Sequence, residues 1–480
     1  MINSKEYYLD LFGVSVADLE NLAAEALRGG GDYCDLYFED TFYSDLLLRD
    51  SQVSAGGSHL DYGCGVRVLS GEKTGYAYSE STDPASLRAA AQAAGVIADG
   101  SVCEPQAVSS ANRYFGKPNP AADRYPMLGD WRSAAGASSV PWLEKIEALI
   151  RAKEQRTVKV IASLSSSVSD ILMFNSYGEL KFETRPLASL SVTVIYQQGG
   201  RTEQKSVGRS FRMGTEFLSE ALVHQIADEA MAGVDNMFEA RRPKGGRMSV
   251  VMGAGASGIL LHEAMGHAFE ADFNRKGQSI FSEKMGQRIC RKGINIIDDG
   301  TITANRGACN FDDEGVPGQK TYMVQDGVLT SYLHDRLSAR CYGVAPTGNG
   351  RRESFRYNPI PRMRATYMDS GNAGTVQDLI AAAGNGIYVD QFSNGEVKIG
   401  EGDFTFYVKS GFLIENGRLT MPVKDINIVG NGPKALADIK AVASDLKIDN
   451  GTWTCGKEQS VAVSCGIPSV LIGKLTVGGE

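Results

Sequence analysis

Two histidines and a glutamate stand at a spacing that suits metal chemistry. They are His262, Glu263 and His267 in the segment HEAMGH. Because the whole chain holds only five histidines, this grouping is improbable as a coincidence. Neutral imidazoles are good zinc ligands, and a carboxylate beside the first ligand can accept a proton from a water molecule that the metal activates. The pattern predicts a metal site for hydrolysis.

The spacing of the two histidines requires an irregular helix. The common zinc-peptidase motif places its histidines four residues apart, on one face of a helix. Five steps along a regular helix turn the second ring about 140° away from the first. One extra residue in a π-helical turn restores the shared face, and Gly266, which lacks a Cβ atom, eases that deformation. We therefore predict a distorted helix at Met265 to His267.

Two histidines do not complete the site, since catalytic zinc usually has three protein ligands and a water molecule. The residues alone leave the third ligand open among the eight cysteines, many carboxylates and the other histidines. Glu270, three residues after His267, is either a partner that orients the ligand ring or an exposed helix carboxylate. The other histidines are His59, His224 and His334.

The elements around these residues predict an α+β protein. We expect two smaller N-terminal α/β modules, a first α+β domain over 1–110 and a central α+β domain with a crossover linker over 111–240. A large β-rich C-terminal domain over 241–480 then carries the metal site. Hydrophobic periodicity predicts helices over 17–28, 84–97, 141–154, 216–238, 257–270, 376–383 and 433–443. It predicts strands over 33–39, 42–49, 65–69, 76–79, 158–165, 171–175, 180–184, 190–197 and 248–252.

Composition excludes several classes of protein. With 49 basic and 57 acidic side chains the net charge is −8, which argues against a general nucleic-acid binder. No apolar run reaches the roughly 18 residues of a membrane span, and no signal peptide is visible. Sparse cysteines indicate reduced thiols and a cytoplasmic protein, with Cys455 a potential exception. The cysteines expected to be reduced are Cys34, Cys64, Cys103, Cys290, Cys309, Cys341 and Cys465.

Longer segments resemble a known family. GILLHEAMGHAFEADFNRKG resembles the metal-binding segment of the catalytic subunit in the TldD/PmbA (TldD/TldE) peptidase family. The segments PTGNGRRESFRYNPIPRMRATYM and TWTCGKEQSVAV and the terminal LTVGG also resemble that family. GVRVLSGEKTGYAYS and NSYGEL fit its two upstream domains. The resemblance covers nearly the whole chain.

The resemblance implies a zinc metallopeptidase of the HExxxH type that hydrolyses small or unfolded peptides. Carried over residue by residue, His262, His267 and Cys455 are ligands of Zn²⁺ and Glu263 is the general base. Without the resemblance, Cys455 would be interpreted as an inert buried thiol. The family also implies a heterodimer with a PmbA/TldE-like subunit. A homodimer stays open, as does iron or manganese in place of zinc.

Three other functions are weighed against this one. The first is a zinc amidohydrolase that acts on a non-peptide amide. The second is a non-catalytic binding subunit, which would lack the histidine motif and the late cysteine. The third is a regulator that acts on a toxin or DNA gyrase system without direct DNA binding.

Two further segments have competing interpretations. GAGASG at 253–258 matches a dinucleotide-binding pattern, but a tight turn that lets a helix pack closely on a strand explains it better. The segment from Arg351 to Arg364 holds five arginines among aromatic residues and prolines. It suits RNA contact, a clamp for a peptide carboxylate, or structural ion pairs and a partner interface. We favour structure or an interface.

Overall fold

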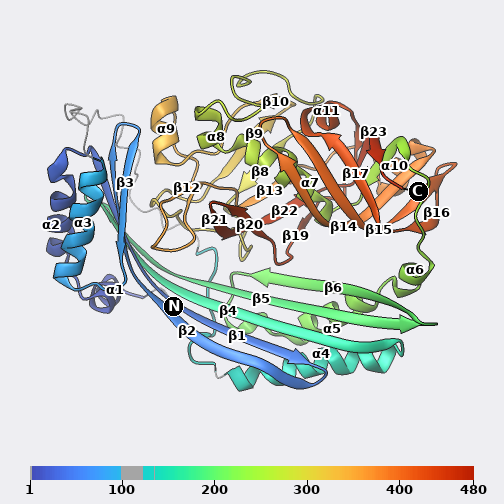
Figure 1. Cartoon of the computed structure of the whole chain (residues 1–480), viewed down its shortest axis with the longest axis horizontal. Coiled ribbons are helices and arrows are strands. Elements are labelled where there is room, and N and C mark those ends of the chain that lie inside the picture. Colours follow the sequence, from blue (N-terminus) through green and yellow to red (C-terminus); the bar gives the residue numbers. More distant parts are fainter. Residues whose placement is uncertain (1–2, 99–122, 135, 480) are drawn as a thin grey trace.

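A six-stranded antiparallel sheet with long, curved strands forms the N-terminal half of the protein (Figure 1). The computed structural model describes residues 3–98, 123–134 and 136–479. The strand order β3-β2-β1-β4-β5-β6 joins strands from the first two predicted modules in one sheet. The predicted domain boundaries stay a prediction. The strands are β1 (Tyr33–Arg49), β2 (Gln52–Ser70), β3 (Lys73–Ser79), β4 (Thr157–Asn175), β5 (Leu180–Gln198) and β6 (Arg201–Phe211).

These strands are longer than the sequence predicts, because adjacent predicted strands fuse. Strand β1 runs through 40–41 without a turn, and β4 continues from 158 to 175. In β5 the chain passes through Pro186, which pairs with Val168 of β4, whereas the pairing with β6 begins only at Ala188. A proline lacks an N–H group, so it is tolerated where one side of the strand has no ladder partner.

Helices cover one face of this sheet at its two ends (Figure 1). At one end α1, α2 and α3 bury apolar side chains against β1 and β2, and at the other end α4 and α5 pack on β4 and β5. The predicted helix 216–238 is interrupted, because Gly233 adopts a left-handed φ of 70°. These helices are α1 (Lys5–Phe12), α2 (Val16–Ala26), α3 (Pro84–Ala98), α4 (Val140–Lys153), α5 (Glu220–Met231) and α6 (Val234–Glu239).

The large β-rich C-terminal domain confirms the predicted α+β fold class. One of its sheets has the order β14-β7-β23-β17-β15-β16, and an additional β14–β15 pairing closes five of these strands into a ring. The predicted helix 433–443 is wrong in its second half, which pairs with β23 as strand β18. The strands are β7 (Gly246–Met252), β14 (Gly386–Lys398), β15 (Asp403–Glu415), β16 (Arg418–Val423), β17 (Ile426–Asn431), β18 (Ile439–Val442) and β23 (Val470–Val477).

The C-terminal domain has a second sheet, of order β10-β9-β8-β13-β22-β19. Two separate two-stranded sheets, β11–β12 and β20–β21, also belong to this domain. Its strands are β8 (Ile296–Asp299), β9 (Lys320–Gln325), β10 (Val328–Leu329), β13 (Ala365–Met368), β19 (Lys447–Asp449) and β22 (Ser464–Ile467). The hairpin strands are β11 (Gly350–Arg351), β12 (Ile360–Pro361), β20 (Thr454–Lys457) and β21 (Gln459–Ala462). The helices are α7 (Ile259–Leu261), α8 (Ala271–Arg275), α9 (Arg336–Tyr342), α10 (Val376–Ala383) and α11 (Gly432–Ala437).

The two halves meet through apolar and charged side chains. Phe355 is fully buried against Tyr37 and Met173 of the N-terminal sheet. The Arg352 guanidinium lies 4.2 Å from the centre of the Tyr37 ring.

In the described part of the chain, no helix is long and apolar enough to cross a membrane. Every described cysteine is free, all but Cys455 belong to the thiols expected to be reduced, and Cys103 lies outside the described residues.

Candidate metal centre

A π-helical turn carries the histidine pair. It spans 262–266 and is preceded by α7 and followed by a 3₁₀ turn over 267–269. The backbone N–H of His267 donates to the carbonyl oxygen of His262, the i to i+5 bond that defines a π turn. The two ring centres lie 5.2 Å apart. The predicted distortion is therefore present, although it begins at His262 rather than at Met265.

Gly266 packs closely on the Met363 side chain. A Cβ atom at this position would lie 2.0 Å from Sδ of Met363. The φ of Gly266 is −55°, which any residue can adopt, so the constraint on a larger side chain here is the space that Met363 fills rather than backbone conformation. The sequence analysis expected Gly266 to ease the deformation, but its backbone is ordinary, and the contact with Met363 could not be known from local spacing.

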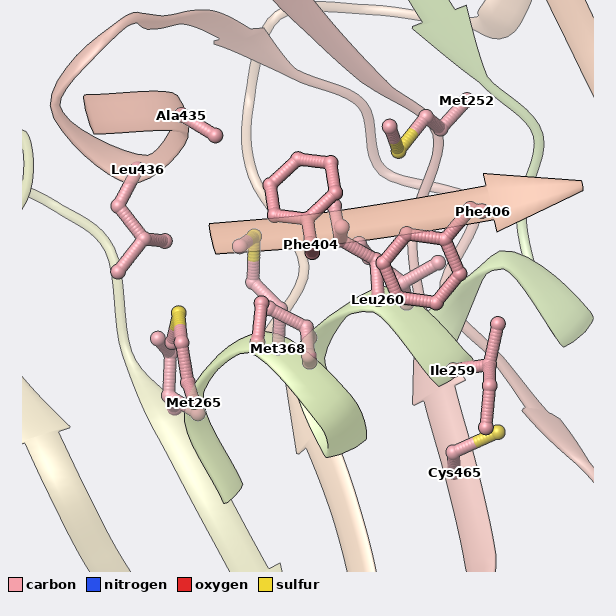
Figure 2. Packing of buried hydrophobic residues seen from close by; sticks show 14 of the residues in the cluster. Met252, Ile259, Leu260, Met265, Met368, Phe404, Phe406, Ala435, Leu436 and Cys465 are labelled. Atoms are coloured by element: carbon pink, nitrogen blue, oxygen red, sulfur yellow. The ribbon is translucent and has the colours of Figure 1, made fainter. Parts of the chain in front are cut away.

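Apolar side chains hold the same helical segment between the two C-terminal sheets. Figure 2 shows Leu260 and Met265 among side chains that include Met368 and Phe404. Each such side chain, once buried, contributes roughly 2 kcal/mol. At the start of the segment, a Cβ atom on Gly258 would lie 2.5 Å from the backbone nitrogen of Gly466 in β22. Gly258, the last glycine of GAGASG, therefore permits close helix–strand packing, which agrees with the tight-turn interpretation.

Cys455 reaches the histidines from the β20–β21 hairpin. Its Sγ atom lies 3.1 Å from Nε2 of His262 and 3.2 Å from Nε2 of His267. The three donor atoms all lie within 4.8 Å of one another. Ligand atoms on a tetrahedral zinc ion are separated by about 3.5 Å, given the usual bond lengths. The donor set and its spacing therefore fit a zinc ion, and all three side chains are buried.

The charges around this cluster favour a thiolate. Burial favours the neutral thiol of Cys455, but the His262 imidazole and hydrogen bonds from both rings lower its pKa to about 4. Burial also opposes a charge on His267, yet the carboxylate of Glu270 and the sulfur of Cys455 raise the pKa of this histidine to about 10. The thiolate is the form of cysteine that binds a metal ion, and a metal ion would have to displace the proton on His267.

Glu270 is a buried partner of the ligand ring, not an exposed carboxylate. Its Oε2 atom accepts a hydrogen bond from Nδ1 of His267 at 2.9 Å and one from Nζ of Lys457 at 3.1 Å. Although burial disfavours its charge, Lys457 and His267 lower the pKa of Glu270 to about 2. Sequence reasoning missed Lys457, because the lysine lies 187 residues from Glu270.

Glu263, the predicted general base, is half-buried and directly follows His262. Its carboxylate has no hydrogen bond or ion pair to any described residue, so it can accept a hydrogen bond from a water molecule. Its catalytic role stays a prediction.

The other histidines lie outside the cluster. His59 is exposed and stacks on Tyr43 with ring centres 4.7 Å apart, and His224 is exposed on α5. His334 is buried, which lowers its pKa to about 4, and its Nδ1 lies 3.3 Å from Oγ of Ser338. A cavity of about 770 Å³ between β6, α6 and strands of the C-terminal domain and a second of about 870 Å³ within the C-terminal domain are not lined by His262, His267 or Cys455.

Arginines of the segment from Arg351 to Arg364 form hydrogen bonds and ion pairs with other parts of the chain. Arg351 donates to the carbonyl oxygens of Met363 and Ala462 at 2.6 and 2.8 Å. Arg356 forms ion pairs with Asp61 and Glu80 of the N-terminal half. These contacts agree with the favoured structural interpretation.

Comparison with known proteins places the chain in a family. The model described as PmbA/TldA metallopeptidase domain 1 matches 34–98, that of the central domain 132–234 and that of the C-terminal domain 245–479. A Haemophilus influenzae protein named Metalloprotease TldD homolog is 40% identical over 457 residues, 93% of each chain.

Two further similarities concern the metal and the fold. A Saccharolobus solfataricus protein named Zinc metalloprotease TldD homolog is 32% identical over 294 residues, 61% of this chain and 65% of that protein. The crystal structure of TldE from Thermococcus kodakarensis has the same fold, with a TM-score of 0.71 and 18% identity over 96% of this chain and all of that chain. The chain therefore belongs to the PmbA/TldA (TldD/PmbA) metallopeptidase family as a TldD-like member.

Proposed function

We propose that this protein is a zinc-dependent peptidase in which His262, His267 and Cys455 hold the metal and Glu263 is the general base. One observation carries the proposal: three potential ligand atoms, from two segments far apart in the sequence, lie within 4.8 Å of one another, and all three residues are buried. The name of the Saccharolobus relative supports zinc in particular.

The chain's own residues divide the chemistry among them. Zinc, when bound, supplies Lewis-acid polarisation of a carbonyl group and of a water molecule. The carboxylate of Glu263 accepts the proton of the attacking water and delivers it to the leaving amine. Glu270 accepts the Nδ1–H of His267, so the lone pair of Nε2 would face the metal once Nε2 has given up its proton.

The substrate and the partner are also part of the proposal. We infer that the substrates are small or unfolded peptides, because an extended chain can pair with the edge of a strand without regard to its side chains. A TldE-like subunit is the proposed partner, since this chain shares its fold with a protein named TldE. Mass measurement of the protein alone and mixed with a TldE-like subunit separates this heterodimer from a homodimer.

The experiment that tests the proposed function combines metal analysis with Glu263→Gln. The unsubstituted protein is expected to contain about one zinc per chain. The variant should keep this zinc and lose hydrolysis of unstructured peptides about 10²–10⁴-fold. Glu401→Gln, which changes an exposed carboxylate, serves as the control and should retain full activity.

Two outcomes would contradict the proposal. Full peptidase activity of Glu263→Gln would reject Glu263 as the base. Zinc-dependent hydrolysis of non-peptide amides, with no peptide cleaved, would instead establish the amidohydrolase alternative.

A further inference from the structure

Arg362 lies at the junction between the two halves of the metal centre. It directly follows β12, and its side chain is fully buried. The guanidinium donates to the carbonyl oxygens of Cys455 at 2.6 Å and of Gln459 at 2.8 Å. A longer contact of 3.4 Å joins it to the carbonyl oxygen of Lys457. One side chain therefore gathers three carbonyl groups of the hairpin that carries the cysteine.

These contacts are made at the tight turn of the hairpin. The turn is tight, because Glu458 adopts a left-handed φ of 56° between β20 and β21. Buried carbonyl groups at such a turn need donors, since leaving one without a hydrogen bond costs about 1–3 kcal/mol. The fixed fork of an arginine can serve several acceptors at once, whereas a lysine ammonium cannot reproduce that geometry.

The same short segment also contacts the histidine half of the site. Nε of Arg362 lies 3.7 Å from Oε1 of Glu270, whose other oxygen accepts from His267. The next residue, Met363, packs closely on Gly266, where an added Cβ atom would lie 2.0 Å from Sδ of Met363. The segment 362–363 thus touches both the cysteine hairpin and the π turn, which lie far apart in the sequence.

We propose that Arg362 is a positioning residue that sets the distance between the sulfur of Cys455 and the two histidine rings. It does not touch the metal itself. This inference rests on the proposed function only in that a metal binds these three side chains. It adds that a residue outside the ligand set determines how closely the two halves of the site approach.

The test uses the full chain with Arg362→Lys, which keeps the positive charge, and Arg362→Gln, which keeps part of the hydrogen bonding. Zinc affinity is measured by competition with a chelator, and alkylation of Cys455 by iodoacetamide is followed in the metal-free protein by peptide mapping. Both variants should bind zinc about 10–100-fold more weakly, the usual range for residues that support metal ligands. Alkylation of Cys455 should be faster than in the unsubstituted protein, because a looser hairpin exposes the sulfur.

A matched control separates positioning from general stability. Arg364 is also buried, and its guanidinium donates to the carbonyl oxygen of Gly348 at 2.6 Å rather than to the hairpin. Arg364→Lys should lower the thermal midpoint without changing zinc affinity or the alkylation rate at Cys455. An equal loss of zinc affinity in both lysine variants would overturn the positioning role.

The remaining outcomes are also decisive. Unchanged zinc affinity and alkylation in the Arg362 variants would overturn the inference while leaving the zinc site intact. Failure of both Arg362 variants to fold would make the residue a general stabiliser, which also overturns it. If the unsubstituted protein bound no zinc, the proposed function itself would fail, so the two failures are distinguishable.

Discussion

The Sγ atom of Cys455 lies 3.1 Å from Nε2 of His262, although 193 residues separate them in the sequence. The histidine belongs to a π turn packed between two sheets, and the cysteine belongs to a hairpin held by Arg362. Bringing such distant groups together in a buried position costs conformational entropy and desolvation. A cation that binds all three side chains would offset this cost.

Glu270→Gln should weaken zinc binding about 10–100-fold, because the charge that faces His267 is lost while the side chain keeps its size. The change also breaks the buried ion pair between Glu270 and Lys457. Competition with a chelator measures the effect. Asp272→Asn is the matched control, since Asp272 accepts a hydrogen bond from Lys457 at 2.7 Å but forms no hydrogen bond or ion pair with His267. Equal affinities for the two variants would show that the effect comes from Lys457 rather than from the ring.

Gly266→Ala should destabilise the metal-free protein by about 1–3 kcal/mol, because the added methyl group meets Met363. Chemical unfolding measures the free energy. In a double-mutant cycle, Met363→Ala should be less harmful in the Gly266→Ala background than alone, since it removes the clash. Gly57→Ala, where the new Cβ atom meets nothing within 4 Å, should cause no comparable loss. Strictly additive effects would contradict the close contact.

Glu39→Gln should change how stability depends on pH. Burial raises the pKa of Glu39 to about 7 from an ordinary value of 4.5. A carboxyl whose pKa is raised by folding binds its proton more tightly in the folded protein, so it destabilises the fold as pH rises from about 4.5 to 7. The advantage of the variant over the unsubstituted protein should therefore grow across that window, by up to about 3 kcal/mol, and level off above pH 7.

Unfolding measured at several pH values between 5 and 8 tests this prediction. Glu39 accepts a hydrogen bond from the backbone N–H of Phe355, so the measurement also reports on the contact between the two halves of the chain. If the difference in the free energy of unfolding between the two proteins did not change with pH, the raised pKa of Glu39 would be contradicted.

Local reasoning from the sequence reached one part of the metal centre and not the rest. The histidine pair and its distorted helix follow from spacing, because helix geometry alone shows that a regular helix would separate the rings. Cys455 came only from a family resemblance, since no periodicity links a hairpin to a helix 188 residues away. Lys457 and Arg362 were not identified as site residues, because their partners are also distant in the chain.

The fold shows the same division between local and distant information. The helix 376–383 was predicted with its observed bounds, and its start is marked by a capping box between Thr375 and Asp378. The long strands were predicted in pieces, because polar residues at 40–41 suggest a break that cross-strand pairing overrides. Strand β18 was predicted as helix, because its pairing with β23 is invisible in a local window.

The zinc content of Cys455→Ala tests the central claim most directly. Elemental analysis of the folded, purified variant is compared with the unsubstituted protein and with Cys290→Ala, which removes a buried thiol of the same core. We predict about one zinc per chain in the unsubstituted protein and in Cys290→Ala, and a loss of zinc in Cys455→Ala. An unchanged zinc content in Cys455→Ala would contradict the assignment of the metal to His262, His267 and Cys455.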